Sequence, residues 1–463
     1  MAIELKNKKV LVMGLGLLGG GVATTKWLVL HGANVTVTDL RSRGELKDSI
    51  NKLGAAAKKI IFVLGKHRRA DFKTNKIIVV NPAVPRESKY LAIAKKHGAR
   101  LENEASLFFR YCKNPIIAVT GTRGKTTTVN WIYFLLKQRF PKARLTGNSS
   151  DQPMLGILDG LDGKSPVVAE LSSWHLELLN QSNRPPEIAV ITNIYRDHMN
   201  RYKSVKDYAS AKANIFKNQK KGDFLILNKK NEWTKFFLKK FSGWKISSKI
   251  IYSSAKTGIN EKKFSEIYGP HNLENLKTAY LAAKLAGASV SKLRRAAWHL
   301  PQIKYRQELI FESPKLKIIN DTTATSPDGT MAALRRFGKE NIILIAGGTD
   351  KNLEYAPPAG GWAKTVKRFV KPEQLYLLNG SATKKMIAAL EKIGYSKNKK
   401  INFYEDLGGI LKYTTQVIYE KKEKKTKWMI IFSPGAASFE KFKNEFDRGE
   451  KFNLYCKKIF KRR

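Results

Sequence analysis

The sequence has few cysteines, few acidic residues and no long apolar run. Only two cysteines, Cys112 and Cys456, occur in 463 residues, which excludes the disulfide framework of small secreted domains. No apolar stretch approaches the roughly 20 residues that a membrane span needs. The N-terminal residues contain no apolar signal core. We therefore expect a soluble, cytoplasmic protein without a membrane partner.

Acidic residues are outnumbered by basic ones. The 86 lysines and arginines against 38 aspartates and glutamates give a formal net charge of +48, an excess that is typical of nucleic-acid-binding proteins. The basic residues are distributed along the whole chain, however, without a repeat or an arginine-rich tail. This distribution favours a generally lysine-rich surface, which attracts anionic substrates, over a dedicated nucleic-acid interface.

The composition supports several folded domains. Hydrophobic residues make up 42% of the chain and aromatic residues 10%, which is enough for packed cores. At roughly 150 residues per domain, the length predicts about three domains. We place them at residues 1–112, 113–300 and 301–463.

The strongest local signal is a glycine-rich segment that contains a lysine. Ile116–Val119 predicts a buried strand, and Gly121, Gly124, Lys125 and Thr126 follow before a helical pattern begins. In such a segment, backbone N–H groups and the helix N-terminus bind phosphate, the lysine reaches the terminal phosphates, and the hydroxyl ligates Mg²⁺. A glycine turn with an exposed lysine is the alternative. The strand before the segment and the helix after it favour a nucleotide site.

A second glycine motif lies near the N-terminus. Val10–Met13 predicts a strand, Gly14–Gly19 has the spacing GxGxxG, and a helix and the strand Val35–Asp39 follow. Asp39 lies about 20 residues beyond the turn, where an acid contacts a ribose in dinucleotide-binding folds. An NAD-dependent dehydrogenase is the alternative on this motif alone, but it leaves the rest of the chain unexplained.

Asn81–Pro85, after another apolar strand, is either a ligand-binding loop or an ordinary connection.

Polar residues in the middle of the chain also follow apolar strands. Glu170 ends one strand, and Asp197 and His198 follow the next; from such positions side chains hold Mg²⁺ or orient phosphate. Each residue alone is more often a cap or a satisfied polar group, but together they favour a function. Lys212 lies in a small, apolar helical stretch, although most lysines of this chain are expected to be solvated.

The remaining signals lie further along the chain. Asn272 and Asn275 are three residues apart at a helix start, where they suit a base, a ribose or helix capping. The last third contains apolar strands that end in small polar loops, which predicts another doubly wound α/β domain. These strands are expected at residues 317–321, 342–346, 374–378 and 428–432.

Taken together, these stretches resemble the Mur ligases, the ATP-dependent amino-acid ligases of peptidoglycan precursor synthesis. Thr120–Thr127 is similar to the family's phosphate loop TGTNGKTT, with Arg123 in place of asparagine, and residues 170–173 and 192–198 are similar to its magnesium-binding segments. The resemblance covers nearly the whole chain in the same order. It implies an α/β protein with a Rossmann-like N-terminal domain, a central P-loop ATPase-like domain and a C-terminal doubly wound α/β domain.

The resemblance implies cofactors and roles for individual residues. ATP and two Mg²⁺ ions are expected, together with carbamylation of Lys212. The expected catalytic residues are Lys125, Glu170, His198 and Lys212, and the expected metal ligands are Thr126, Glu170, His198 and Lys212. The expected ATP contacts are Gly121, Thr122, Gly124, Lys125, Thr126, Thr127, Asn272, Asn275, Arg306 and Asp321.

Gly347–Lys351 and Ser438–Gly449 look most like the D-glutamate-adding members of the family. This implies UDP-N-acetylmuramoyl-L-alanine and D-glutamate as substrates, and a monomer with no specific nucleic-acid partner. The expected substrate contacts are Leu17, Leu18, Asp39, Arg41, Asn148, Ser172, Thr325, Lys351 and Ser438. Because Thr323 stands where many members have lysine, a ligase for another amino acid remains an alternative. A basic, nucleotide-regulated binding protein without activity is the alternative from another class.

Overall fold

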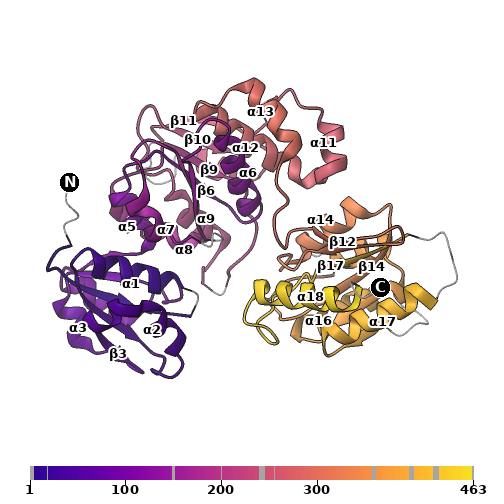
Figure 1. The fold of residues 1–463 in the computed structure, drawn as a ribbon, viewed down its shortest axis with the longest axis horizontal. Helices are drawn as coiled ribbons and strands as arrows, with labels where there is room; N and C mark the ends of the chain where they lie inside the picture. The colour runs from indigo at the N-terminus through magenta and orange to yellow at the C-terminus, as the bar shows by residue number, and fades with distance from the viewer. Residues whose placement is uncertain are drawn as a thin grey trace. The chain divides into compact units, whose positions relative to one another are not determined.

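The computed structural model describes residues 5–17, 19–148, 152–199, 201–238, 246–254, 256–356, 361–395, 401–420 and 427–460. The chain forms two compact units (Figure 1): the first contains residues 1–268 and 272–301, and the second contains residues 269–271 and 302–463. The first unit contains two parallel sheets and the second unit contains one mixed sheet. The division of the chain into three domains with a boundary at residue 112 stays a prediction.

The first sheet is fully parallel, with the strand order β3-β2-β1-β4-β5. This order reverses between β1 and β4, and open α/β sheets bind ligands at such a switch point, outside the carboxyl ends of the strands. The strands are β1 (Lys9–Met13), β2 (Asn34–Asp39), β3 (Ile60–Leu64), β4 (Ile77–Val80) and β5 (Arg100–Glu102). The associated helices are α1 (Gly20–Leu30), α2 (Lys47–Leu53), α3 (Arg69–Thr74), α4 (Lys89–Lys96) and α5 (Glu104–Tyr111).

The second sheet is also parallel, with the order β11-β10-β9-β6-β8-β7. Its strands are β6 (Ile116–Thr120), β7 (Arg144–Gly147), β8 (Val167–Glu170), β9 (Ile188–Ile191), β10 (Phe224–Leu227) and β11 (Lys249–Tyr252). Its helices are α6 (Lys125–Lys137), α7 (Met154–Ile157), α8 (Ser173–Leu176), α9 (Val205–Ala213), α10 (Thr234–Leu238), α11 (Glu261–Tyr268), α12 (Leu273–Leu285) and α13 (Val290–Ala296).

One hydrophobic cluster connects these two sheets. It contains Val12 and Val37 from the first sheet, Ala118 and Ala169 from the second, and Phe108 of α5. Helix α7 packs against both α1 and α5, and α5 packs against α8, as Figure 1 lets the reader follow. Because these residues exclude water together, the two sheets form a single compact unit.

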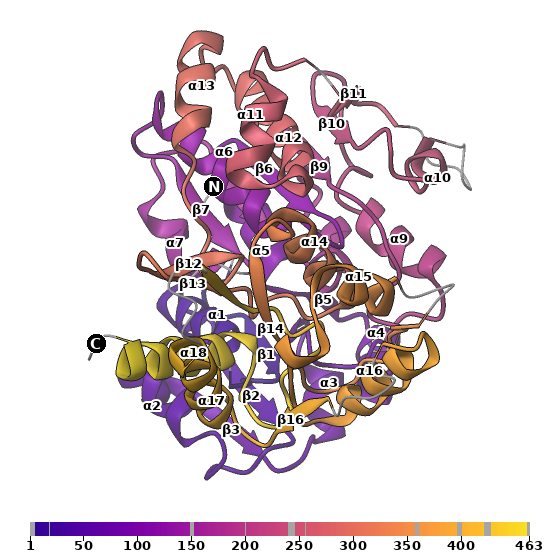
Figure 2. The same cartoon turned by 90° about the vertical axis from the view of Figure 1, so that its right-hand side faces the viewer.

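The third sheet has the order β12-β13-β17-β14-β15-β16, and only its β12–β13 pair is antiparallel. Alternate residues of its central strands belong to two different clusters: Ile342 and Leu344 pack with α14 to α16, whereas Ile343 and Ile345 pack with α17 and α18. Figure 2 shows α17 and α18 next to each other. Helices therefore cover both faces, as in a doubly wound domain.

The strands are β12 (Glu308–Glu312), β13 (Leu316–Asn320), β14 (Asn341–Gly347), β15 (Leu375–Leu378), β16 (Asn402–Tyr404) and β17 (Trp428–Phe432). The helices are α14 (Pro327–Phe337), α15 (Trp362–Phe369), α16 (Ser381–Lys392), α17 (Leu407–Glu420) and α18 (Glu445–Phe460).

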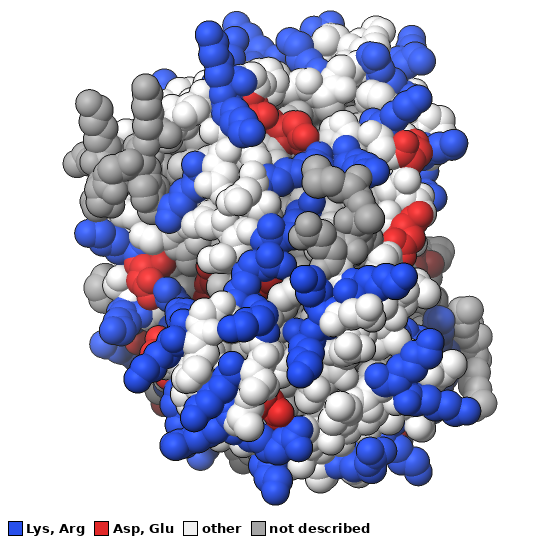
Figure 3. All heavy atoms as spheres, turned by 90° about the vertical axis from the view of Figure 1, so that its left-hand side faces the viewer, with Lys and Arg blue, Asp and Glu red and all other residues white. Residues whose placement is uncertain are grey.

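The predicted α/β fold class is confirmed, and the strands that the sequence predicts are present. Within the described parts of the chain, no helix combines the length and the hydropathy needed to cross a membrane. Figure 3 shows one face of the molecule, on which Lys and Arg side chains are spread widely among a few acidic ones. The positive charge on this face is dispersed, as the sequence predicts.

Candidate active site

The centre of the site lies where β6, β8 and β9 end. These strands are neighbours in the second sheet, and their register places Val119 opposite Glu170 and Thr120 opposite Ile191. Because all three strands are parallel, the segments that follow them emerge at the same edge of the sheet. The glycine-rich loop after β6, the Glu170 carboxylate and the segment after β9 are therefore brought together.

Hydrogen bonds fix the phosphate loop to the segment after β9. The Arg123 N–H donates to Asn193 Oδ1 at 2.8 Å, and the Thr122 N–H donates to the Asn193 carbonyl at 2.8 Å. The Thr192 hydroxyl and the Asn193 amide both donate to the Arg123 carbonyl, at 2.7 and 3.1 Å. The loop backbone is thus arranged before a ligand binds, which is the property that an anion site requires.

Gly124 begins α6 in a left-handed conformation, with φ 81°. A Cβ atom at this position would collide with Asn275 Oδ1. Asn275 also accepts a hydrogen bond from the Thr128 hydroxyl at 3.3 Å and donates to Asn272 Oδ1 at 2.8 Å. The two asparagines that the sequence assigns to the nucleotide therefore lie together, and Asn275 lies against the phosphate loop.

The residues after Gly124 have the chemistry of a Mg²⁺–phosphate site. Lys125 Nζ lies 3.2 Å from the Thr122 carbonyl, and the Thr126 hydroxyl donates to Glu170 Oε1 at 3.3 Å. Glu170 is buried, with 2% of its surface exposed. A hydroxyl and a buried carboxylate side by side are hard oxygen ligands of the kind that Mg²⁺ prefers, so these residues fit the ion.

Among the described residues there is no group of three or more His, Cys, Asp and Glu side chains that could hold a metal ion. Mg²⁺ commonly binds one or two carboxylates and takes its other ligands from water and substrate phosphates. The arrangement of Thr126 and Glu170 agrees with that pattern.

His198 lies on the segment after β9, also with a left-handed backbone, φ 57°. Strained backbone of this kind is concentrated at functional sites. Its ring lies 5.6 Å from the ring of Trp174 and 6.0 Å from that of Tyr208. The neighbouring Asp197 forms an ion pair with Arg123 at 2.8 Å. The additional charge that Arg123 brings to the phosphate loop is therefore paired with this carboxylate.

Lys212 is almost completely buried, with 1% of its surface exposed. Its amine donates to the Gly121 carbonyl at 2.9 Å and to the Thr120 hydroxyl at 3.2 Å, and it lies 4.7 Å from the centre of the Tyr208 ring. Burial lowers the pKa of Lys212 well below its ordinary value, and the charge of nearby Lys125 lowers this pKa further. Both effects act in favour of the neutral amine, which is the nucleophilic form.

The N-terminal glycine turn lies at the switch point of the first sheet. Asp39, which is expected to contact substrate, accepts hydrogen bonds from the backbone N–H groups of Gly16 at 3.1 Å and Arg41 at 3.0 Å. Asn81 donates to the Gly14 carbonyl at 3.2 Å and joins the turn to the loop after β4.

The other expected substrate contacts of the first unit are placed as follows. The Leu17 side chain is 52% exposed beside the glycine turn, and Leu18 lies outside the described residues. The Asn148 N–H donates to the Glu170 carbonyl at 2.9 Å. Ser172 caps α8 by accepting from the His175 N–H at 3.2 Å.

In the second unit, the segments after β13, β14 and β17 carry the residues expected to bind the amino acid. Lys351 Nζ lies 3.4 Å from the Thr325 hydroxyl. Ser438 is 3% exposed, and its hydroxyl has no hydrogen-bond partner among the described residues. A cation and hydroxyl groups can bind a carboxylate, so these side chains have the chemistry that the expected role needs.

Two buried charged residues organise the same ends of the third sheet. Asp321 accepts hydrogen bonds from the Gln307 N–H at 3.0 Å and the Ser433 hydroxyl at 2.8 Å, and burial raises its pKa to about 7 although the charge of Arg306 lowers it. Arg448 of α18 is fully buried, which lowers its pKa to about 9. The Arg448 guanidinium donates to the carbonyls of residues 322, 436 and 437.

Comparison with known proteins identifies the family. Residues 119–268 match the model of the Mur ligase middle domain, and residues 8–102 match the model of the MurD-like Mur ligase N-terminal domain. The UDP-N-acetylmuramoylalanine–D-glutamate ligase of Borreliella afzelii (strain PKo) is 37% identical over 97% of each chain. This chain belongs to the Mur ligase family. The corresponding ligase of Roseiflexus sp. (strain RS-1) is 36% identical over 97% of this chain and 98% of its own.

Solved structures of Mur ligases share the fold. The MurF ligase of Thermotoga maritima in complex with ADP has a TM-score of 0.57 at 15% identity, over 99% of this chain and 96% of its own. A MurF structure from Acinetobacter baumannii has a TM-score of 0.55 at 14% identity, over 97% of this chain and 91% of its own.

Sequence reasoning missed two residues of these sites in this Mur ligase. It gave no role to Asn193, whose position directly after a strand at the carboxyl edge of the sheet was the available signal. It also gave no role to Arg448, because nothing in the sequence distinguishes a buried arginine from a solvated one on an amphipathic helix.

Replacing Gly124 with alanine tests the close approach of Asn275 to the phosphate loop. We expect Gly124→Ala to weaken ATP binding more than about tenfold, because a Cβ displaces Asn275 and the left-handed backbone disfavours any side chain. Calorimetric titration with ATP measures the effect, and a thermal melt checks the fold.

Gly163→Ala is the matched control, because Gly163 has φ 73° but no atom within 4 Å of the added Cβ. Equal losses of ATP affinity in both variants, or no loss in either, would contradict the assignment of Gly124 and Asn275 to the site.

Proposed function

We propose that this Mur ligase joins D-glutamate to UDP-N-acetylmuramoyl-L-alanine, with conversion of ATP to ADP and phosphate, in peptidoglycan precursor synthesis. The observation that carries the proposal is the group of Lys125, Thr126, Glu170 and Lys212 at one edge of the second sheet, on a phosphate loop that is already held in place. The D-glutamate ligases that match over nearly their full length support the choice of substrates.

The reaction activates a carboxylate before it forms an amide. An oxygen of the L-alanyl carboxylate attacks the γ-phosphorus of ATP and the bond to the β-γ bridging oxygen breaks, which gives an acyl phosphate and ADP. The amine of D-glutamate then attacks the acyl carbon and loses a proton, and phosphate leaves with the carbon–oxygen bond electrons. In the first step Lys125 neutralises charge on the transferring phosphoryl group, which is the main catalytic contribution in such transfers.

The proposed metal ligands are Thr126, Glu170, His198 and carbamylated Lys212, with two Mg²⁺ ions. Bound Mg²⁺ supplies positive charge to the phosphate oxygens and orients them for in-line transfer. Gly121, Thr122, Thr127, Asn272, Asn275, Arg306 and Asp321 are proposed to hold the rest of the nucleotide. Leu17, Leu18, Asp39, Arg41, Asn148 and Ser172 are proposed to contact or shape the site of the UDP-linked substrate.

Lys351, Thr325 and Ser438 are proposed to bind the carboxylates of the incoming amino acid. Thr323, by contrast, donates its hydroxyl to the Tyr305 carbonyl at 2.8 Å, so it supplies no cation where many family members have one. This difference favours one competing function, a ligase for another amino acid, and the assay below separates the two.

The direct test of the function is amino-acid-dependent ADP formation. We expect the wild-type protein, with ATP, Mg²⁺ and UDP-N-acetylmuramoyl-L-alanine, to release ADP with D-glutamate and not with L-alanine, L-glutamate or no amino acid. Mass spectrometry of the product identifies the new amide. Lys125→Ala should lower kcat by about a hundredfold or more, because a developing charge loses its partner.

ADP release with a different amino acid would show that the protein is a ligase with another amino-acid specificity. An absence of release with every amino acid, from folded protein that binds ATP, would contradict an enzymatic function and favour the nucleotide-regulated binding protein.

The environment of the Lys212 amine supports the proposed carbamylation. The neutral nitrogen attacks CO₂, a carbon–nitrogen bond forms and a proton is released to solvent, so that a buried amine becomes a carboxylate-like anion. That anion supplies hard oxygen ligands beside Thr120 and Gly121. An ammonium group in the same place would repel a bound cation.

Labelling with ¹³C-bicarbonate tests this modification. We expect a carbamate carbon signal by NMR from the wild-type protein and no such signal from Lys212→Met. We also expect removal of CO₂ to lower the ligase activity of the wild-type protein, and addition of bicarbonate to restore it. Lys217→Met is the control, because burial also lowers the pKa of Lys217 but this side chain is only partly buried. A signal that persists in Lys212→Met would contradict the assignment.

A further inference from the structure

The loop after β4 lies beside the glycine turn at the switch point of the first sheet. Asn81 donates to the Gly14 carbonyl at 3.2 Å, and its own carbonyl accepts from the Val84 N–H at 3.0 Å. A Cβ on Gly14 would lie 2.8 Å from that of Asn81. The loop and the turn therefore form one surface, at the place where an open α/β sheet binds its ligand.

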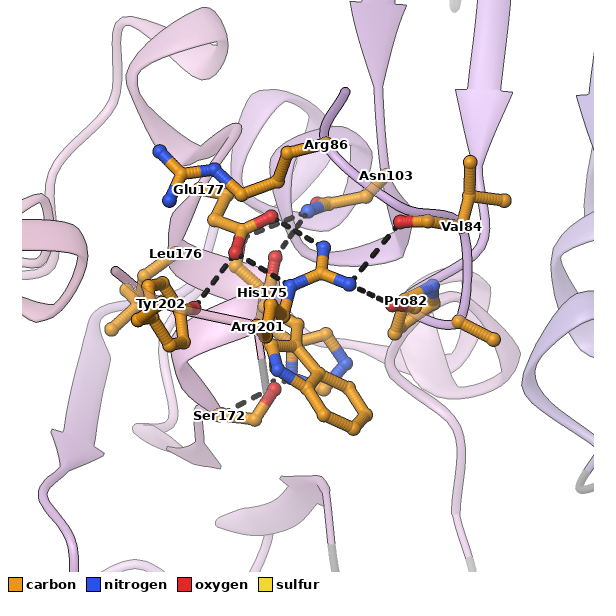
Figure 4. A network of polar contacts seen from close by, with 12 residues as sticks. Pro82, Val84, Arg86, Asn103, Ser172, His175, Leu176, Glu177, Arg201 and Tyr202 are labelled. Atoms are coloured by element: carbon orange, nitrogen blue, oxygen red, sulfur yellow. Dashed lines mark hydrogen bonds and ion pairs between the residues drawn. The ribbon is translucent and has the colours of Figure 1, made fainter. Parts of the chain in front are cut away.

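Arg201, which follows β9, holds this loop from the other sheet of the unit (Figure 4). Its Nη1 donates to the Pro82 carbonyl at 2.9 Å and to the Val84 carbonyl at 3.2 Å. Its Nε and Nη2 donate to the two carboxylate oxygens of Glu177 at 2.9 and 2.7 Å. Every contact is charge-assisted, and the paired contact with Glu177 fixes the plane of the guanidinium.

Glu177 is itself held in place. The Tyr202 hydroxyl donates to its Oε1 at 2.7 Å, and Tyr202 is 1% exposed. The side chains of Arg201 and Glu177 are only 14% and 12% exposed. A pair this far from solvent keeps its geometry much better than a surface ion pair.

The backbone of Arg201 belongs to the segment of His198. The Arg201 N–H donates to the His198 carbonyl at 2.9 Å. The Arg201 guanidinium lies 5.4 Å from the centre of the Trp174 ring, which in turn lies 5.6 Å from the His198 ring. One residue thus contacts both the loop at the first sheet's ligand edge and the segment that carries a proposed metal ligand.

We propose that Arg201 is a positioning residue that sets the Pro82–Val84 loop, and the UDP-linked substrate bound there, relative to His198. Within the proposed function, it orients the acceptor carboxylate toward the phosphate loop while itself contacting neither substrate. The proposal rests on the proposed function for the identity of that substrate. Arg201 can make both sets of contacts at once, because its Nε and Nη2 bind Glu177 while its Nη1 binds the carbonyls of the loop.

Binding measurements on lysine variants test this role. Arg201→Lys keeps the charge beside Glu177 but cannot maintain the paired contact and both carbonyl contacts together. We expect it to weaken binding of UDP-N-acetylmuramoyl-L-alanine about tenfold, while the Kd of a non-hydrolysable ATP analogue changes less than twofold. Arg201→Met should have a larger effect of the same kind; should it fail to fold, the lysine variant decides.

Arg86→Lys is the matched control. Arg86 follows the same loop and donates to both carboxylate oxygens of Asp207 in α9, at 3.1 and 3.2 Å. Its side chain is 37% exposed, and among the described residues it donates no hydrogen bond to the Pro82 or Val84 carbonyl. Its guanidinium lies 5.5 Å from the centre of the Tyr202 ring, and a lysine keeps the positive charge at that place. We expect this variant to bind both ligands like the wild type.

Equal weakening of both ligands by Arg201→Lys, no weakening of either, or the same selective loss in Arg86→Lys would overturn the positioning role. A different outcome separates this role from the proposed function. If Arg201→Lys selectively loses UDP-substrate binding, but the wild-type protein forms no ADP in response to D-glutamate, the role of Arg201 is supported and the proposed function is contradicted. Failure of the wild-type protein to bind the UDP-linked substrate would overturn both.

Discussion

The hydrogen bonds between the phosphate loop and the segment after β9 are the constraint on which the rest of the site depends. Thr192 and Asn193 satisfy the backbone groups of Thr122 and Arg123, so the loop keeps a conformation that an isolated glycine segment would lose to entropy. Parallel pairing of β6 with β8 and β9 makes this possible, because it brings three strand ends to one edge. The same pairing places the Glu170 carboxylate within hydrogen-bond distance of the Thr126 hydroxyl.

Burial determines the protonation chemistry of the site. Lys212 contacts the phosphate loop, and burial lowers its pKa because water cannot solvate the charged form. Arg123 lies on the same loop and forms an ion pair with Asp197 at 2.8 Å. The same physical cause acts in the second unit, where burial raises the pKa of Asp321 and lowers that of Arg448, because it disfavours the charged form of both groups.

The sequence was sufficient to predict the fold class, and it also predicted that the phosphate loop follows a buried strand and that Glu170 ends another, as they do in the structure. Strands buried on both faces appear as apolar runs, and the phosphate loop has a spacing fixed by its chemistry. Short strands such as β7 and β16 have no such run and were not identified. Roles that depend on a distant partner were also invisible: Arg201 contacts a carbonyl more than a hundred residues away in sequence. The substrate contacts of Asp39 and Ser172 stay predictions, and the hydrogen bonds by which these two side chains hold the local backbone are revealed only by the coordinates.

The most direct test of the account is the transfer of an oxygen atom. UDP-N-acetylmuramoyl-L-alanine labelled with ¹⁸O in its terminal carboxylate is incubated with the protein, ATP, Mg²⁺ and D-glutamate, and the released phosphate is analysed by mass spectrometry. An acyl phosphate predicts one ¹⁸O atom in each phosphate, because the carboxylate oxygen attacks phosphorus and leaves with it. Unlabelled phosphate alongside amide formation would contradict activation at this phosphate loop, and with it the central claim.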